Sequence, residues 1–352
     1  MQNLKCDVAV FGFGEITNMI IAKIVGEGLS VVCITNYVPF GMDHYTSNQV
    51  LFYSREEILD VNLSCEVSLV TWRNSKILIE ESKDFYKWFN SDSFISLKNF
   101  FLSSASVYKD SPHPSTESKE NLEASILQNP KFLLEEDLMR IMKKKNIRNC
   151  NLRISNVYGS TITQGFIGLI FRSLVTLNPV KRITGRGVYR DFITVGDVSL
   201  AVIGLINCNQ YAENVNISTG IPTSSDEVFE SFYRSGYCLN ETQVPYMEES
   251  MKASVILNCD LLSSMLDWHP APFARRTAEW VCEVPLSFRK AVLFPPLRQQ
   301  SPPCPRWVSL RIWASPVPFL PACREGCLRG LAAFPVLQDV QEAEDSWPHP
   351  PP

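Results

Sequence analysis

Short apolar runs alternate with helix-like stretches through the first 160 residues of this 352-residue chain. The runs expected to form strands are Val8–Phe11, Leu29–Ile34, Val67–Val70, Asn99–Leu102 and Asn149–Ile154. Apolar residues at helical spacing occur between them, at Ile16–Gly26, Ser82–Phe89 and Phe132–Lys145. Strands that alternate with helices are typical of a parallel sheet covered on both faces. The sequence therefore predicts an α/β fold.

A glycine turn follows the first of these strands and opens the first helix. It contains Gly12, Gly14, Glu15 and Ile16, with Thr17 where a third small residue is usual. In this context backbone N–H groups and a helix N-terminus can approach a pyrophosphate, as in a Rossmann-type sheet. These four residues are candidate cofactor ligands, although the charge of Glu15 opposes a pyrophosphate if it faces inward. The alternative is a tight turn without a ligand.

The second strand ends at Ile34 and is followed by Thr35 and Asn36. An Asp or Glu at this point usually holds the adenosine ribose of NAD, and a nearby Arg accommodates the 2′-phosphate of NADP. Neither residue is acidic here, and no Arg follows directly. Thr35 and Asn36 can still hydrogen-bond a ribose hydroxyl, so the choice between NAD and NADP stays open.

Six later motifs follow one another in a recognisable order. They are Ser103–Tyr108, Lys131 with Glu135, Arg153–Gly159, Gly185–Val198, Asn214–Gly220 and Asp260–Trp268. Together they resemble the extended short-chain dehydrogenases/reductases of the NAD-dependent epimerase/dehydratase family, over roughly residues 5–282. The resemblance implies NAD or NADP as cofactor, a nucleotide sugar as substrate, and an epimerase, dehydratase or reductase reaction. It also implies a Rossmann-type sheet with a smaller C-terminal substrate lobe, mainly residues 166–189 and 217–284.

The resemblance also assigns roles to individual residues. Ser104 is expected to hydrogen-bond the substrate hydroxyl, and Lys131 to bind the nicotinamide ribose and to assist catalysis. Ser106, Asn156 and Arg190 are expected to bind substrate, the last two through its phosphates, because the Arg fork matches phosphate oxygens. Structural alternatives exist for three of them. Ser104 suits a strand-end turn, Lys131 suits a solvated first helical turn, and Arg190 suits an ion pair with a neighbouring aspartate.

One departure limits the catalytic prediction. The family has a tyrosine four residues before its lysine, and this chain has Leu127 there. A phenol can accept a proton near neutral pH when a cation lowers its pKa, whereas Leu127 has no ionisable proton. Tyr108 and Tyr158 lie in nearby motifs as unsupported substitutes. A catalytically inactive relative that binds a nucleotide or nucleotide sugar, as a binding or regulatory subunit, is therefore the alternative function.

Composition excludes several other classes of function. A formal net charge of −4 gives no basic footprint for nucleic acid, and no apolar run is long enough to cross a bilayer. Eleven scattered cysteines predict free thiols in a reducing cytoplasm and no metal site. Related proteins commonly dimerise through a helix pair, so a homodimer involving Phe132–Lys145 is expected by analogy.

Composition changes sharply at Pro285. From there to Pro352 the chain contains 14 of its 23 prolines and no sustained periodicity. Proline removes backbone donors and fixes φ, so this stretch cannot continue a helix or a central strand. The sequence predicts one cofactor-binding domain over 1–284 and a disordered tail over 285–352.

Overall fold

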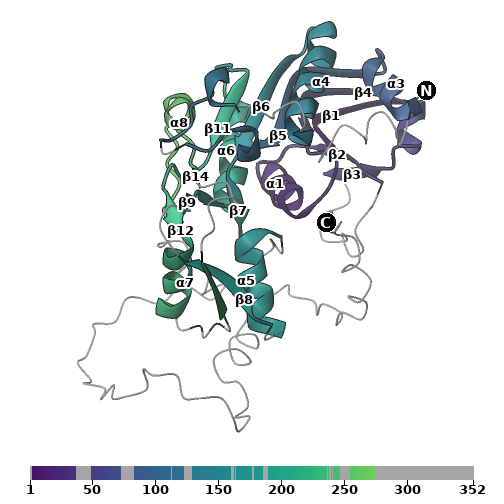
Figure 1. Ribbon diagram of the computed structural model, residues 1–352. Helices are drawn as coiled ribbons and strands as arrows, with labels where there is room; N and C mark the ends of the chain where they lie inside the picture. Colours follow the sequence, from purple (N-terminus) through teal and green to yellow (C-terminus); the bar gives the residue numbers. More distant parts are fainter. Residues whose placement is uncertain are drawn as a thin grey trace, which may run out of the picture. The chain divides into compact units, whose positions relative to one another are not determined.

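Seven parallel strands, counted among the described residues, form the main sheet in the order β11-β6-β5-β4-β1-β2-β3 (Figure 1). Their bounds are β1 Gln2–Phe11, β2 Val31–Ile34, β3 Val50–Tyr53, β4 Val61–Val70, β5 Phe94–Ser104, β6 Arg148–Ile154 and β11 Asn214–Ile217. The predicted α/β, Rossmann-type sheet is confirmed. The edge strand β3 was not predicted, because part of it is exposed and its run of four residues is short.

The computed structural model describes most of the chain up to residue 273. The described ranges are 2–36, 49–72, 83–111, 113–122, 129–159, 162, 164–176, 178–184, 189–235, 237, 239, 241–245 and 254–273. All of them belong to one unit, Met1–Leu297. The predicted tail and the position of Leu127 lie outside the described residues, so the proposed division at residue 284 stays a prediction.

Helices cover both faces of the sheet, because each strand sends alternate side chains to opposite sides. Val8 and Val10 belong to one apolar core, which includes side chains of α1 (Glu15–Gly26) and α6 (Val195–Asn207). Ala9 and Phe11 belong to the other core, with side chains of α3 (Lys83–Asn90) and α4 (Pro130–Lys144). The continuous apolar runs of the strands and the helical spacing of apolar residues in the helices therefore place buried residues on both faces of the sheet.

A third apolar core lies outside the main sheet. It contains Phe192, Phe229 and Phe232 with residues of α5 (Gly165–Thr176) and α7 (Ser225–Arg234). Short strands complete this region: β7 Asn156–Tyr158, β8 Val180–Thr184, β9 Tyr189–Arg190, β10 Phe192–Thr194, β12 Thr223–Ser224, β13 Glu241–Pro245 and β14 Ser254–Val255. The last described helix is α8, Asp260–Leu266. Among the described residues, no helix is long and apolar enough to cross a membrane.

Candidate functional site

One cleft of about 710 Å³ lies at the carboxyl ends of the strands. This is the edge at which open parallel sheets usually bind ligands. Nine of the eleven residues predicted for the site line it. They are Gly12, Gly14, Glu15, Ile16, Thr35, Asn36, Ser104, Lys131 and Asn156. Segments far apart in the sequence therefore meet in one cleft. Ser106 and Arg190 are not among its lining residues.

The glycine turn has the backbone shape that close approach of a ligand requires. Gly12 has a φ of +104°, which L side chains rarely adopt, and a Cβ there would lie 2.6 Å from Thr71 Oγ1. Its N–H donates to the carbonyl of Ile34 at 2.9 Å, which ties the turn to β2. A Cβ on Gly14 would meet nothing within 4 Å. The turn is thus closed on the sheet side and open at Gly14.

The N-terminus of α1 faces the same cleft. Gly14 is its N-cap and contributes no side-chain hydrogen bond to the first turn. Backbone N–H groups of a first helical turn have no intrahelical partner and favour an anion. Glu15, in the first turn, also lines the cleft, so one negative charge is already present there. The backbone fits a dinucleotide pyrophosphate, with Glu15 as the opposing charge.

The end of β2 is joined to the end of β3. Ile34 and Tyr53 are register partners, and the N–H of Thr35 donates to the carbonyl of Tyr53 at 2.9 Å. Thr35 is buried and Asn36 is exposed. Arg55, just beyond β3, lines the cleft together with both residues. Sequence reasoning missed Arg55 because it considered only residues directly after the second strand.

Lys131 joins the ends of two strands. Its Nζ donates to the carbonyls of Trp72 and Leu102, both at 2.8 Å, and lies 4.9 Å from the centre of the Phe101 ring. Trp72 itself is buried against Phe11 and Phe89. Lys131 is therefore a half-buried cation at the wall of the cleft, and the alternative of a solvated lysine is wrong.

Ser104 ends β5 and lines the cleft. Its Oγ accepts a hydrogen bond from the N–H of Ser106 at 3.2 Å, which caps the short 3₁₀ helix Ala105–Val107. Ser104 therefore has the structural role of a serine in a strand-end turn, and it also lines the cleft. Ser106 is exposed, and its carbonyl accepts from the side chain of Asn129 at 2.7 Å. Its predicted contact with substrate stays untested.

A buried polar network lies behind Ser104. Glu135 accepts from Arg153 Nη2 at 2.8 Å and Nε at 3.1 Å, and also from Ser103 Oγ. Arg153 Nη1 donates to the hydroxyl of Tyr108 at 3.1 Å, and that hydroxyl donates to Asn216 Oδ1 at 2.7 Å. The side chains of Arg153 and Glu135 are only 4% and 2% exposed, so the pair is a buried ion pair. We define these five residues as the Glu135–Arg153 network.

The network removes Tyr108 from consideration as a substitute base. Its side chain is fully buried, and burial raises the pKa of Tyr108 to about 12 despite the attraction of Arg153. Neither Tyr108 nor Tyr158 lines the cleft. Tyr158 instead packs edge-on against Phe273, with ring centres 5.1 Å apart. The proton-transfer role that the sequence left open for them finds no support in the geometry.

The two predicted phosphate ligands lie differently. Asn156 lines the cleft, and both its backbone N–H and its Nδ2 donate to the carbonyl of Asp191 at 3.0 Å. Arg190 is half-buried on β9, and its Nη1 donates to the carbonyl of Tyr189 at 2.9 Å. The Asp191 carboxylate accepts from Thr219 and from the N–H of Gly220 at 2.9 Å. Burial raises the pKa of this Asp191 carboxyl. This motif therefore anchors the turn after β11.

The charged side chains among the described lining residues are Glu15, Arg55 and Lys131. That described lining includes no Tyr, His, Cys or Asp.

Helix α4 begins at Pro130, and Asn129 caps it by accepting from the N–H of Lys131 at 2.9 Å. Pro130 thus lies in the first turn of α4, where proline is tolerated. Among the described residues no group of His, Cys, Asp and Glu could hold a metal ion.

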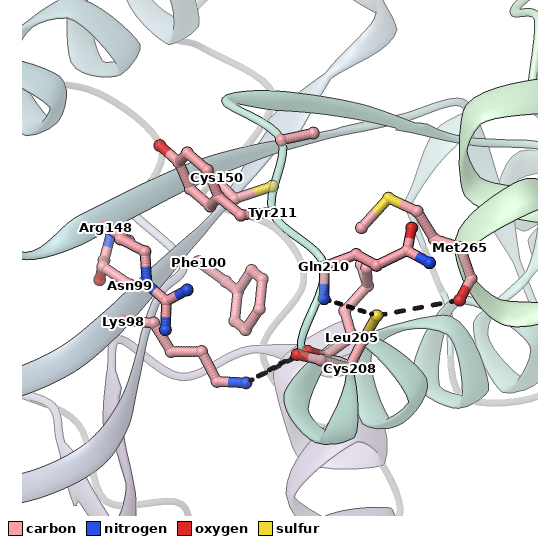
Figure 2. A pocket seen from close by; sticks show the side chains of 11 residues that line it. Lys98, Asn99, Phe100, Arg148, Cys150, Leu205, Cys208, Gln210, Tyr211 and Met265 are labelled. Carbon is pink, nitrogen blue, oxygen red and sulfur yellow. Dashed lines mark hydrogen bonds between the residues drawn. The ribbon is translucent and has the colours of Figure 1, made fainter.

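A second cavity, of about 20 Å³, lies away from the cleft and has room for one water (Figure 2). Figure 2 shows Lys98 reaching the C-terminal end of α6. Its Nζ donates to the carbonyl of Ile206 and, at 3.4 Å, to those of Leu205 and Cys208. A cation at this end of a helix satisfies its free carbonyls. This lysine therefore has a structural role.

Comparison with known proteins agrees with the geometry. Residues 56–218 match the model of the NAD dependent epimerase/dehydratase family. The match spans a little less than half of the chain. No curated protein matches the chain. The matching family region contains Ser104, Lys131, Asn156 and the Glu135–Arg153 network, whereas the glycine turn precedes it.

Several solved structures share the fold of this chain. MoeE5 in complex with UDP-glucose and NAD has a TM-score of 0.62 and 16% identity, covering 78% of this chain and 97% of its own. UDP-glucose 4-epimerase from Thermotoga maritima, with UDP-glucose, has a TM-score of 0.60 and 17% identity, covering 79% and 97%. UDP-glucose 4-epimerase from Thermus thermophilus, with NAD, has a TM-score of 0.61 and 18% identity, covering 82% and 100%.

Proposed function

We propose that this protein is an NAD(P)-dependent nucleotide-sugar epimerase-like protein. The observation that carries the proposal is the meeting of Gly12, Ser104, Lys131 and Asn156 in one 710 Å³ cleft. The segments that contribute them are far apart in the sequence. A shared cleft is expected if the family's site is retained, and is not expected of four unrelated structural residues.

The glycine-turn end of the cleft suits the dinucleotide. The backbone from Gly12 to Ile16 would receive the pyrophosphate, Thr35 and Asn36 the adenosine ribose, and Lys131 the nicotinamide ribose. When bound, the nicotinamide supplies the hydride acceptor for the reaction. The residues of this chain would bind and orient it, with the Lys131 ammonium held in place by the carbonyls of Trp72 and Leu102.

The opposite end suits the nucleotide sugar. Ser104 presents a hydroxyl at the end of β5, and Asn156 lies at the start of β7 in the same cleft. Two of the similar structures contain UDP-glucose, so a UDP-sugar is the substrate proposed here. Arg190 is not among the lining residues, and the proposal does not depend on it. A cytoplasmic location and a homodimer stay predictions.

The experiment combines binding with turnover. Purified protein is titrated with NAD and NADP by calorimetry and is then incubated with each cofactor and a panel of UDP-, GDP- and dTDP-sugars. We expect cofactor binding and conversion of a UDP-sugar, followed by chromatography. Cofactor binding without any conversion would instead favour the non-catalytic binding relative. No binding of either cofactor would refute the proposal.

A pair of lysine variants provides the control. Lys131→Met and Lys98→Met each remove an ammonium group that donates to backbone carbonyls. Lys131 lines the cleft, whereas Lys98, on β5, contacts the C-terminal end of α6 and does not line the cleft. We expect Lys131→Met to weaken cofactor binding about tenfold or more, as the loss of a charged hydrogen bond does. Lys98→Met should leave the affinity within about twofold while lowering stability.

A further inference from the structure

Arg55 is the positively charged side chain nearest the end of β2 among the described lining residues of the cleft. Ile34 and Tyr53 are partners in the parallel pairing of β2 and β3. Asn36 and Arg55 each lie two residues beyond that pair, and both line the cleft. Parallel strands that end in register place such residues side by side. A basic fork is therefore present where a dinucleotide fold receives the adenosine ribose.

The turn that carries Arg55 is well defined. The N–H of Ser54 donates to the Glu57 carboxylate at 2.7 Å, and the N–H of Glu57 donates to Ser54 Oγ at 3.1 Å. The Arg55 guanidinium lies 5.6 Å from the centre of the buried Phe85 ring. A guanidinium over an aromatic face is held by cation–π attraction. The backbone and the side chain of Arg55 are thus both positioned before any ligand arrives.

The charges at the end of β2 also differ from those expected for NAD. A carboxylate there accepts from both ribose hydroxyls of NAD and would repel a 2′-phosphate. This chain has Asn36, whose amide can donate to a phosphate oxygen. Glu56 and Glu57 are exposed and do not line the cleft, and Glu57 is bonded to Ser54. Glu15 is the carboxylate of the described lining, and it lies at the glycine turn.

We propose that Arg55, with Asn36 beside it, binds the 2′-phosphate of the dinucleotide and makes this protein prefer NADP(H) to NAD(H). The inference rests on the proposed function, because it assigns the cofactor of the same cleft. The solved structures that contain NAD are at most 18% identical to this chain, and they show only its fold. An Arg fork matches two phosphate oxygens, whereas it has no such partner on an unphosphorylated ribose.

The test measures dissociation constants by calorimetry with two pairs of probes, NADP and NAD, and 2′,5′-ADP and 5′-AMP. The second pair isolates the phosphate from the nicotinamide. We expect the phosphorylated probe of each pair to bind at least about tenfold more tightly, as expected for charged hydrogen bonds. Arg55→Gln should abolish that preference and leave NAD affinity within about twofold. Asn36→Asp should shift the preference toward NAD.

Arg140→Gln is the matched control, because Arg140 is exposed on α4, pairs with Asp137 and does not line the cleft. It makes the same change of charge and should keep the preference for NADP. Arg55→Lys retains the charge without the fork and should keep part of the preference for NADP. If thermal melting shows that Arg55→Gln does not fold, Arg55→Lys takes its place in the test.

Equal or tighter binding of NAD by the unmodified protein would overturn the inference and leave the proposed function standing. Equal weakening of both cofactors by Arg55→Gln would also overturn it. Binding of neither cofactor would refute both proposals.

Discussion

The two ends of the cleft are held in place by different kinds of interaction. At the glycine-turn end, backbone hydrogen bonds and apolar packing position the site: the N–H of Gly12 donates to Ile34, and Phe11 packs against Trp72. At the Ser104 end, a buried polar network stands behind the strands, with the ion pair of Glu135 and Arg153 at its centre. The same sheet edge is therefore stabilised by packing at one end and by charge at the other.

This difference explains how the Ser104 end is retained in a chain that has Leu127 where the family has its tyrosine. Each member of the Glu135–Arg153 network depends on its partners, because an unpaired polar group in a dry interior is costly. All five members lie on α4, β5, β6, β11 or the turn after β5, and they hydrogen-bond to one another. Among the described residues, the framework behind Ser104 thus forms in a chain that lacks the phenol of the family.

The largest expected effect comes from breaking the buried ion pair. Glu135→Leu leaves the Arg153 guanidinium without its carboxylate in a site that is 4% exposed. Loss of one partner of a buried pair should lower the free energy of unfolding by about 3–5 kcal/mol, measured by urea denaturation. The double variant Glu135→Leu/Arg153→Met should recover much of that loss, since no charge is then left unpaired.

An exposed pair on the same helix provides the control for this prediction. Asp137 and Arg140 are 2.8 Å apart on α4, and the Arg140 side chain is 74% exposed. Asp137→Leu should lower stability by at most about 1 kcal/mol, because exposed ion pairs contribute little. Similar losses for Glu135→Leu and Asp137→Leu would contradict the contrast between the two ends of the cleft.

A smaller effect is expected at the glycine-turn end. Gly12→Ala places a Cβ at a φ of +104° and 2.6 Å from Thr71 Oγ1, whereas Gly28→Ala has a φ of +80° and open space. Positive φ should cost each variant about 1–2 kcal/mol of stability, with more lost at Gly12 through the contact with Thr71. By calorimetry, only Gly12→Ala should also weaken binding of the dinucleotide. Equal binding by both variants would place the dinucleotide elsewhere.

Much of the fold could be predicted because its signals are local. Buried parallel strands require continuous apolar runs, and a strand-to-helix glycine turn requires a residue tolerant of positive φ, as Gly12 shows. The helix expected at Phe132–Lys145 similarly corresponds to α4, which begins two residues earlier at Pro130, since proline suits the first turn of a helix. Each of these features is set by a few residues that are close together in the sequence.

Other parts of the site depend on contacts that no local pattern contains. Arg55 lines the cleft because β3 pairs with β2, and that pairing is set by the topology of the sheet. The motif with Arg190 and Asp191 was assigned to phosphate binding, whereas Asp191 holds the turn at Gly220 and Arg190 is not in the lining. A motif therefore predicts reliably which segments lie close together. It predicts less reliably which side chain faces the ligand.

The smallest expected effect is that of restoring the phenol alone. Two residues four apart share a helix face only if the helix contains both, and α4 begins at Pro130. Asn129, with a ψ of +115°, is extended, as a residue before proline tends to be. Leu127→Tyr should therefore leave the turnover of a UDP-sugar unchanged within about twofold.

The triple variant Leu127→Tyr/Asn129→Ala/Pro130→Ser removes the cap and the proline, so the helix can extend. Turnover should then rise by roughly tenfold or more, as positioned proton transfer allows. A comparable rise in the single variant would show that the phenol reaches Ser104 without the helix, and that the start of α4 does not limit catalysis.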